Sequence, residues 1–229
     1  LFKFFEYIYI KKFKLIFVVS ESIGNWYKKT YNIKKPIVIY NTPKFDKFKK
    51  NNMFRNKFSI SKKKIIFLYQ GGLTFNRGIE ECLDVFKKLE KKNVVLVLMG
   101  YGKLKEKILI YQKKYSNIFY HPAVSMDKIM KYTSSADIGL SLIKNSSLSY
   151  NFSMPNKLFE YLLSGLPVVV SNLFEMKKFV KKYKCGWVVK PQQIRIKKIV
   201  QNINKGKLKK VKINLKKISK LYNWQSQEK

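Results

Sequence analysis

The sequence predicts an α/β fold in which a parallel β-sheet is covered by helices on both faces. Short apolar runs alternate with longer amphipathic segments from about residue 61 to residue 191, which is the order of strands and crossover helices in such a sheet. Two of these runs, at residues 65–69 and 94–99, are apolar almost without interruption, as expected of strands buried on both faces. We therefore predict one Rossmann-like domain over residues 61–191.

The expected elements alternate along this domain without exception. Strands are predicted at residues 65–69, 94–99, 118–120, 138–142, 168–170 and 187–189. Helices are predicted between them at residues 78–89, 104–114, 126–132 and 174–182, with one more inside residues 153–165.

The domain is organised around residues 153–171, SMPNKLFEYLLSGLPVVVS. Ser153 can cap a helix, Pro155 fits its first turn, and Gly165 ends it before the strand begins. Glu160 lies within this helix, and the helix N-terminus just upstream is suited to a phosphate. The same pattern also fits an ordinary helix that carries a surface glutamate.

The segments on either side of this domain differ in character. Residues 1–45 are predicted to be a truncated piece of a second Rossmann-like domain, with strands at 15–19 and 37–40 and a helix at 21–29. The opening 13 residues fit either a helix between two strands or an interfacial helix on a membrane. Lysine and asparagine predominate in residues 46–60, which are predicted to be a linker. C-terminal helices are expected over residues 192–229.

The composition limits the class of protein. With 229 residues, 46% of them hydrophobic, the chain can bury a core without disulfides. Cys82 and Cys185 lie in apolar contexts and are expected to be buried thiols in a reducing compartment. His121 is the single histidine, which excludes a multi-histidine metal site, and we expect it to be structural.

The net charge of +36 could hold the protein on nucleic acid or on an anionic membrane. Because the lysines are spread along nearly every segment, a solvated basic surface is the main expectation. Attraction to an anionic membrane surface is a secondary one, and no specific nucleic acid is expected as a partner. The sequence contains no apolar run of membrane-spanning length and no recognisable signal peptide. The predicted location is the cytoplasm, with peripheral contact at the inner membrane face.

Glycine-containing loops follow the predicted strands, at the edge where ligands bind in parallel sheets. In the loop at residues 70–78, Gly71 and Gly72 allow a tight turn, and Arg77 could offer its guanidinium to a phosphate. Alternatively, the glycines only make the loop flexible and Arg77 is an exposed surface residue without a ligand. The Gly-Tyr-Gly run at residues 100–102 lacks the third glycine of a nicotinamide-cofactor fingerprint, so no such cofactor is predicted.

Several segments, taken in order, resemble the donor-binding half of a retaining GT-B glycosyltransferase of the family 4 type. They are YQGGLTFNRGIEECLDVFKKL, VLVLMGYG, NIFYHPAVSMDKIMKYTSSADIGLSLI, MPNKLFEYLLSGLPVVVSNLFEMKKFV and CGWVV. The earlier VVSESIGNWYKKTYNIKKPIVIYNTP is similar to the end of that family's N-terminal domain, and LYNWQSQEK is similar to its closing helix. The resemblance implies the C-terminal half of a GT-B fold, preceded by a remnant of the acceptor-gripping domain.

The resemblance also implies roles for the matching residues. Glu160 matches the second glutamate of the family's paired motif, which hydrogen-bonds the donor ribose, and Arg77 matches the basic residue that contacts the diphosphate. Gly72 and the backbone around Ser153 and Met154 match the loops that face the phosphates and the sugar. The catalytic residues are not assigned and are expected in the missing N-terminal domain, and no metal is implied.

Two positions depart from the family pattern. The first glutamate of the pair would fall at Phe152, which cannot accept hydrogen bonds from sugar hydroxyls, and Gly72 replaces the usual arginine of the glycine loop. The helix follows a Pro-x-Lys-x-x-Glu-Tyr version of the motif. In this version Lys157 is a candidate cation for the phosphate or the sugar, and it fits equally well as one of many surface lysines.

The function implied by the resemblance is a hexosyltransferase-type glycosyltransferase acting in cell-surface polysaccharide synthesis. It would move a sugar from a nucleotide-sugar, which is a substrate and not a cofactor, to a glycan or lipid-linked acceptor by a retaining, front-face mechanism. The sequence shows no carboxylate pair suited to double displacement. Two alternatives stay open: a basic nucleic-acid- or membrane-binding module, and an inactive truncated glycosyltransferase that binds a donor without transferring its sugar.

Overall fold

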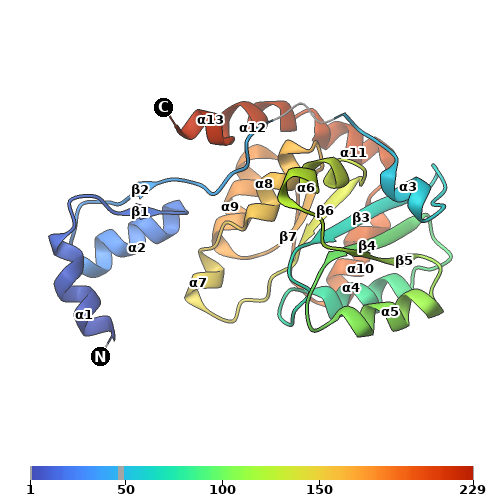
Figure 1. The fold of residues 1–229 in the computed structure, drawn as a ribbon, viewed down its shortest axis with the longest axis horizontal. Coiled ribbons are helices and arrows are strands. Elements are labelled where there is room, and N and C mark those ends of the chain that lie inside the picture. Colours follow the sequence, from blue (N-terminus) through green and yellow to red (C-terminus); the bar gives the residue numbers. More distant parts are fainter. Residues whose placement is uncertain (1, 46–48, 229) are drawn as a thin grey trace.

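The computed structural model describes residues 2–45 and 49–228. Within these residues, the strands of the main domain form a six-stranded parallel sheet with the order β5-β4-β3-β6-β7-β8 (Figure 1). Each strand lies where an apolar run predicts one, so the α/β, Rossmann-like fold class is confirmed. The strands are β3 (Ile65–Gln70), β4 (Val94–Gly100), β5 (Ile118–Pro122), β6 (Ile138–Ser141), β7 (Val168–Ser171) and β8 (Gly186–Val189).

Helices cover both faces of the sheet because each strand directs alternate side chains into two cores. In β3, Phe67 and Tyr69 belong to the first core, and Ile66 and Leu68 belong to the second. The first core includes α4 (Ile79–Lys87), α5 (Lys105–Lys114) and α10 (Gln193–Asn202), and the second includes α6 (Met126–Thr133), α8 (Asn156–Leu163), α9 (Phe174–Tyr183) and α12 (Leu215–Leu221) (Figure 1).

The strand order reverses between β3 and β6, and ligands of open α/β sheets bind outside the carboxyl ends of the strands at such a point, which we call the crevice. Gly139 in β6 leaves room there for Tyr161 of α8, since a Cβ on Gly139 would lie 2.2 Å from the tyrosine ring. The Tyr161 hydroxyl donates to Leu140 O at 3.2 Å and accepts from Gln70 N at 2.9 Å. Helix α8 is therefore fixed to the ends of both central strands.

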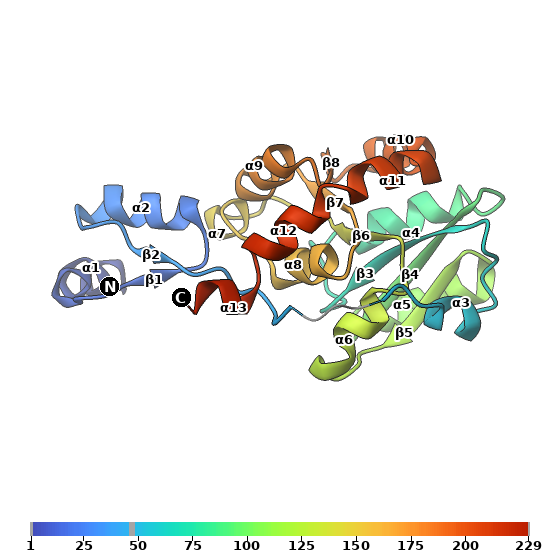
Figure 2. The same ribbon diagram turned by 90° about the horizontal axis from the view of Figure 1, so that it is seen from above.

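Residues 2–45 form a smaller unit beside the sheet domain (Figures 1 and 2). Ser20 caps its second helix by accepting from Ile23 N, and the Ser20 hydroxyl donates to Phe152 O at 2.7 Å. Ser22 donates to the buried carboxylate of Glu175 in α9. These bonds hold the unit against the sheet domain. Its elements are α1 (Phe2–Tyr9), the 3₁₀-helix η1 (Ile10–Lys12), β1 (Phe17–Val18), α2 (Glu21–Tyr31) and β2 (Ile37–Val38), and the two strands pair in parallel.

The C-terminal helices end next to the smaller unit. After α11 (Lys205–Lys212) and α12, helix α13 (Trp224–Gln227) lies beside the chain that leaves β2 (Figure 2). The Gln227 side chain accepts from Tyr40 N at 2.6 Å and donates to Tyr40 O at 2.8 Å. Trp224 N donates to Pro43 O at 3.1 Å. The C-terminal helix thus connects the two units of the chain.

The segment predicted to be a linker, residues 46–60, is packed against the sheet in its described part, whereas residues 46–48 lie outside the described residues. It contains α3 (Met53–Lys57), in which Phe54 is fully buried in the second core. Arg55 forms an ion pair with Asp137 at 2.7 Å, just before β6. Residues 49–60 therefore contribute to the core of the sheet domain. The limits of the domains stay a prediction.

Cys82 and Cys185 are buried free thiols, as predicted, and burial raises the pKa of Cys185 to about 12. Over residues 2–45 and 49–228, no helix combines the length and the apolar character that crossing a bilayer requires.

Candidate functional site

The candidate site lies at the carboxyl ends of β3 and β6, where Gln70 meets helix α8. Gln70 is buried at the last position of β3, and its Nε2 donates to Glu160 Oε2 at 2.5 Å. Its Oε1 accepts from the hydroxyl of Thr133, in α6, at 2.7 Å. The two ends of one amide therefore orient the Glu160 carboxylate relative to the crevice.

Lys157 lies one helical turn before Glu160 and next to the glycine loop. Its Nζ is 3.9 Å from the centroid of the Tyr69 ring and 3.7 Å from the position that a Cβ on Gly71 would occupy. Burial, together with the positive charge of Arg77, lowers the pKa of Lys157 to about 7, and the Glu160 carboxylate opposes this shift. The ammonium therefore lacks full stabilisation, and a ligand phosphate would supply the missing negative charge.

The pKa of Glu160 is shifted in the opposite direction, toward the neutral acid. Burial raises this pKa, while the hydrogen bond from Gln70 and the charge of Lys157 lower it. Two groups of opposite charge thus share a partly desolvated crevice, and hydroxyl donors from a ligand would stabilise the charged carboxylate. Perturbed groups of this kind in a crevice are typical of functional sites.

The glycine loop after β3 is held by backbone contacts to the loop after β4. Gly71 N donates to Met99 O at 3.0 Å, and Leu73 N donates to Tyr101 O at 2.7 Å. Gly100 has φ +153°, and a Cβ there would lie 1.9 Å from Gly71 O. The glycine at position 100 is therefore needed for close packing of the end of β4 against the glycine loop.

Arg77 lies at the far end of the glycine loop, just before α4. Its guanidinium carbon is 5.2 Å from the centroid of the Tyr150 ring. The following Gly78 has φ +75°, and a Cβ there would lie 2.5 Å from both Cβ and O of Leu142. This close approach brings the loop against the end of β6. Arg77 and Glu160 both lie near enough to Lys157 to shift its pKa, and Tyr69 contacts both Lys157 and Gly72.

Ser153 does not have the predicted capping role. Helix α8 begins at Asn156, its N-cap residue is Pro155 with ψ 141°, and within the described chain no side chain caps this end. The reason is local, because Pro155 is itself extended and the helix can begin only after it. The Ser153 hydroxyl instead donates to Tyr150 O at 2.8 Å, and Met154 is buried in the second core.

Phe152, at the position of the absent first glutamate, contacts the smaller unit. Its carbonyl accepts the Ser20 hydroxyl, and its ring packs edge-on against Phe174 at 6.3 Å between centroids. An aromatic residue here contributes to the junction between the two units.

His121 has the features of a structural residue. It is 2% exposed, its Nδ1 lies 2.7 Å from Pro122 O, and its ring packs against Phe54 and Tyr132. Burial lowers the pKa of His121, which favours the neutral ring. Among the described residues, no three His, Cys, Asp or Glu side chains are grouped as metal ligands would be.

Three residues of the site were not found from the sequence: Gln70, Thr133 and Tyr69. Gln70 contacts Glu160, which is 90 positions away in the chain, and Thr133 contacts Gln70, which is 63 positions away. A signal did exist for Gln70, because it is a polar residue that directly ends an apolar strand at the edge where ligands bind. Tyr69 fits an apolar run, and only its contact with Lys157 gives it a further role.

Several solved structures share the fold of this chain, among them WaaG, described as a glycosyltransferase involved in lipopolysaccharide biosynthesis. Sucrose-phosphate synthase from Thermosynechococcus elongatus has a TM-score of 0.77 at 16% identity, with 96% of this chain and 57% of that chain covered. HepE of Anabaena in complex with UDP has a TM-score of 0.76 at 14% identity, with 93% and 61% covered. A mutant of S. aureus TarM in complex with Fondaparinux, alpha-GlcNAc-glycerol and UDP has a TM-score of 0.70 at 16% identity, with 98% and 44% covered.

The present chain spans between 44% and 61% of the length of these three proteins, and the low identities show a shared fold alone. A search of curated protein sequences finds no match. The family model described as glycosyl transferases group 1 matches residues 50–219, which include the whole sheet and the candidate site. The chain therefore belongs to the glycosyl transferases group 1 family.

Proposed function

We propose that this chain binds the nucleotide-sugar donor of a glycosyltransferase. The observation that carries the proposal is the partly buried Glu160 carboxylate, held by Gln70 in the crevice near Lys157 and Arg77. This arrangement places one hydrogen-bond acceptor and two cations at the strand ends where ligands bind. The descriptions of HepE and TarM, which name UDP as a ligand, support the same class of donor.

Each group has a proposed partner on the donor. The diphosphate would lie by the Gly71-Gly72 loop, where Lys157 and Arg77 provide positive charge. The ribose hydroxyls would donate to Glu160, whose carboxylate has lost part of its hydration. As the sugar leaves, charge accumulates on the diphosphate, and preorganised cations stabilise this charge without reorganisation.

The finer features of the reaction are also proposals. They are a family 4-like, retaining mechanism with front-face attack, and a glycan or lipid-linked acceptor in cell-surface polysaccharide synthesis. The donor is a substrate, and no further cofactor is proposed. Because the chain spans 44% to 61% of three proteins of similar fold, we assign the acceptor contacts to a part of the fold outside these 229 residues. This chain by itself is expected to bind a donor with little or no transfer.

Calorimetric titration with UDP, GDP and ADP at low salt and at about 0.15 M salt tests the donor site. We expect saturable binding of one diphosphate that persists at the higher salt and is lost in Glu160→Gln. The matched control is Glu106→Gln, which changes an exposed glutamate on α5 and keeps wild-type affinity. Equal binding of all three nucleotides, removed by salt and unaffected by Glu160→Gln, would show only general attraction to polyanions.

A further inference from the structure

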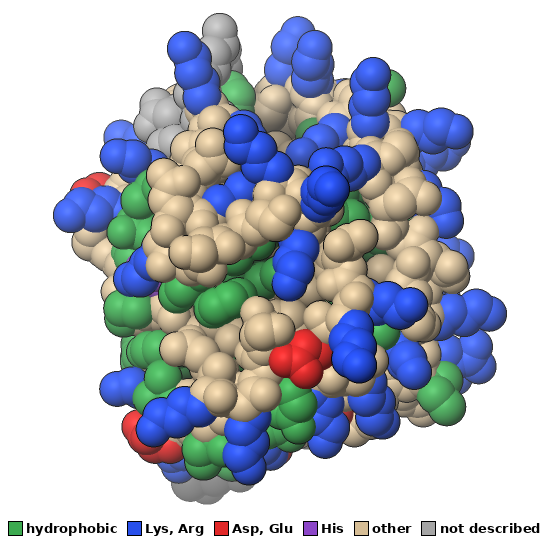
Figure 3. Space-filling model, turned by 90° about the vertical axis from the view of Figure 1, so that its right-hand side faces the viewer, with side chains coloured by type: hydrophobic (Ala, Val, Ile, Leu, Met, Phe, Trp, Pro, Cys, Tyr) green, Lys and Arg blue, Asp and Glu red, His purple; other side chains and the backbone are tan. Residues whose placement is uncertain are grey.

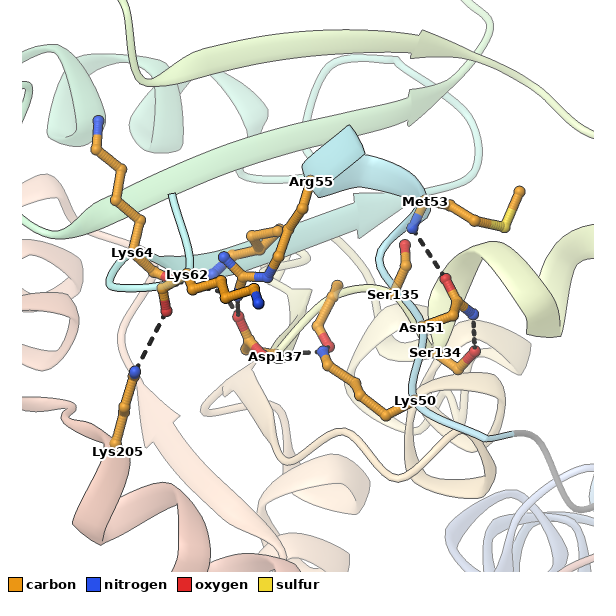
Figure 4. A network of polar contacts seen from close by, with 12 residues as sticks. Lys50, Asn51, Met53, Arg55, Lys62, Lys64, Ser134, Ser135, Asp137 and Lys205 are labelled. Atoms are coloured by element: carbon orange, nitrogen blue, oxygen red, sulfur yellow. Dashed lines mark hydrogen bonds and ion pairs between the residues drawn. The ribbon is translucent and has the colours of Figure 1, made fainter. Parts of the chain in front are cut away.

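A second polar cavity lies at the amino edge of the sheet. Its volume is about 350 Å³, and it lies between α3, the turn before β3, the residue before β6, and α11. Figure 4 shows Arg55 and Lys50 directed at Asp137, with Lys62 and Lys205 close by. The charged residues that line the cavity are Arg55, Lys62, Asp137, Lys205, Lys209 and Lys212.

Asp137, the one acid among the described lining residues, is already fully engaged. Its Oδ2 accepts from Arg55 Nη2 at 2.7 Å and from Ile66 N at 2.9 Å, and its Oδ1 accepts from Lys50 Nζ at 2.9 Å. The carboxylate therefore offsets Arg55 and Lys50. The charge of the lysines on the turn before β3 and on α11 remains in excess around the cavity.

Three of these lysines share one face of α11. Lys205, Lys209 and Lys212 are spaced i, i+4 and i+7, and like charges at such spacings destabilise a helix. Leu208, which also lines the cavity, is buried and anchors the helix to the first core. Burial lowers the pKa of Lys50, and the charges of Lys212 and Arg55 add to this shift while Asp137 opposes it. Like charges are thus held close together, and a bound anion would relieve their repulsion.

The cavity differs from the general basic surface of the chain. Figure 3 shows Lys and Arg side chains spread over one face of the molecule with few acidic side chains between them. Isolated surface lysines of this kind attract anions only weakly at physiological salt. In the cavity, by contrast, cations from separate elements line one open hollow with room for a ligand.

We propose that this cavity binds a compact polyphosphate group, either free in solution or carried on a lipid headgroup. Several lysine ammonium groups can contact several phosphate oxygens at once, whereas a single carboxylate would offset only one of them. The cavity is separate from the proposed donor crevice, because the two lie at opposite ends of β3, a strand about 20 Å long. The proposal therefore does not depend on the donor site.

Calorimetry with inorganic tripolyphosphate at about 0.15 M salt tests the proposal. The background variant carries Arg77→Ala and Lys157→Ala, so that phosphate binding in the donor crevice is removed whether or not a nucleotide binds there. On this background, Lys205→Gln, Lys209→Gln and Lys212→Gln are combined. The matched control combines Lys91→Gln, Lys113→Gln and Lys114→Gln, which remove the same charge from exposed positions elsewhere.

We expect one tripolyphosphate per chain, with affinity reduced at least about tenfold by the α11 substitutions and nearly unchanged by the control set. Thermal melting of each variant establishes that the protein is folded. Equal loss of affinity in both sets, or several weakly bound ions per chain, would overturn the proposal, because either result is general charge attraction.

Sedimentation with phospholipid vesicles distinguishes the two sources of the phosphate. Vesicles with phosphatidylinositol bisphosphate, whose headgroup carries several phosphates, are compared with vesicles of phosphatidylcholine alone, using the same two sets of variants. Binding to the anionic vesicles that depends on the α11 lysines assigns the site to a lipid headgroup, and tripolyphosphate binding without vesicle binding assigns it to a free polyphosphate. The proposal is wrong if neither ligand binds in an α11-dependent manner.

Discussion

The ammonium of Lys157 lies 3.9 Å from the centroid of the Tyr69 ring, and the hydroxyl of the same tyrosine donates to Gly72 O at 2.7 Å. Tyr69 therefore contacts both the glycine loop and the lysine of α8. The aromatic face gives the desolvated ammonium partial electrostatic compensation and packs equally well against the neutral amine. This contact keeps Lys157 in the crevice in both protonation states, and its charge can respond to a bound phosphate.

Binding of a nucleoside diphosphate is expected to take up a proton at about pH 8. The pKa of Lys157 is about 7, so the side chain is mostly neutral at that pH before binding. A diphosphate beside the amine favours its charged form and raises the pKa. Calorimetry in two buffers that differ in ionisation enthalpy measures the uptake. Lys157→Met should abolish it, and Lys103→Met, at an exposed position, should not.

Without a ligand, Lys157 is expected to make the stability of the chain increase with pH. Its pKa falls from 10.5 to about 7 on folding, so between these values the unfolded chain binds a proton that the folded chain does not. The free energy of unfolding therefore rises with pH in this window, and below pH 7 the cost of burying the charge is fully present. Urea denaturation of wild type and Lys157→Met across the window measures the effect. A constant difference between the two proteins would contradict it.

Gln70→Leu is expected to weaken nucleotide binding by about tenfold, because the Glu160 carboxylate loses its partly buried hydrogen bond. Burial already raises the pKa of Glu160, and removal of the Gln70 donor should raise it further. Affinity in the variant should then recover partly as pH rises, which a purely structural defect would not produce. Gln201→Leu, at an exposed position on α10, is the control.

The central strands β3 and β4 could be predicted because each is buried along its whole length and apolar almost without interruption. The short helices α3 (Met53–Lys57) and α7 (Leu148–Asn151) could not, since they have 5 and 4 residues and are too short for a periodic pattern. Their position depends on tertiary contacts such as the burial of Phe54.

In the candidate site too, single residues could be recognised in the sequence, whereas contacts between residues far apart in the chain could not. Glu160, Lys157 and Arg77 stand out by residue type and by position relative to glycines, so they could be proposed from the sequence. The predicted capping role of Ser153 is wrong because the extended backbone of Pro155 takes the N-cap position. The contact of Gln70 with Glu160 joins residues 90 positions apart, and only the folded structure reveals it.

Gly100→Ala is expected to destabilise the chain by about 3 kcal/mol, because a Cβ would lie 1.9 Å from Gly71 O in addition to the positive φ. The matched control is Gly165→Ala, where φ is +78° and no atom lies within 4 Å of the Cβ position among the described residues. This variant should cost about 1 kcal/mol from backbone conformation alone. Urea denaturation gives both values, and equal costs would contradict the predicted contact between the two glycine loops.

Asp137→Asn is expected to destabilise the chain by about 3 kcal/mol, because the amide cannot offset the charge of Arg55, whose side chain is 11% exposed. The side-chain oxygen of asparagine can still accept from Ile66 N, so the loss isolates the charge and not the hydrogen bond to the strand. Urea denaturation at neutral pH measures the cost, with Asp127→Asn at an exposed position as the control. A cost within about 0.5 kcal/mol of that control would mean that solvent screens the Arg55–Asp137 pair despite its burial.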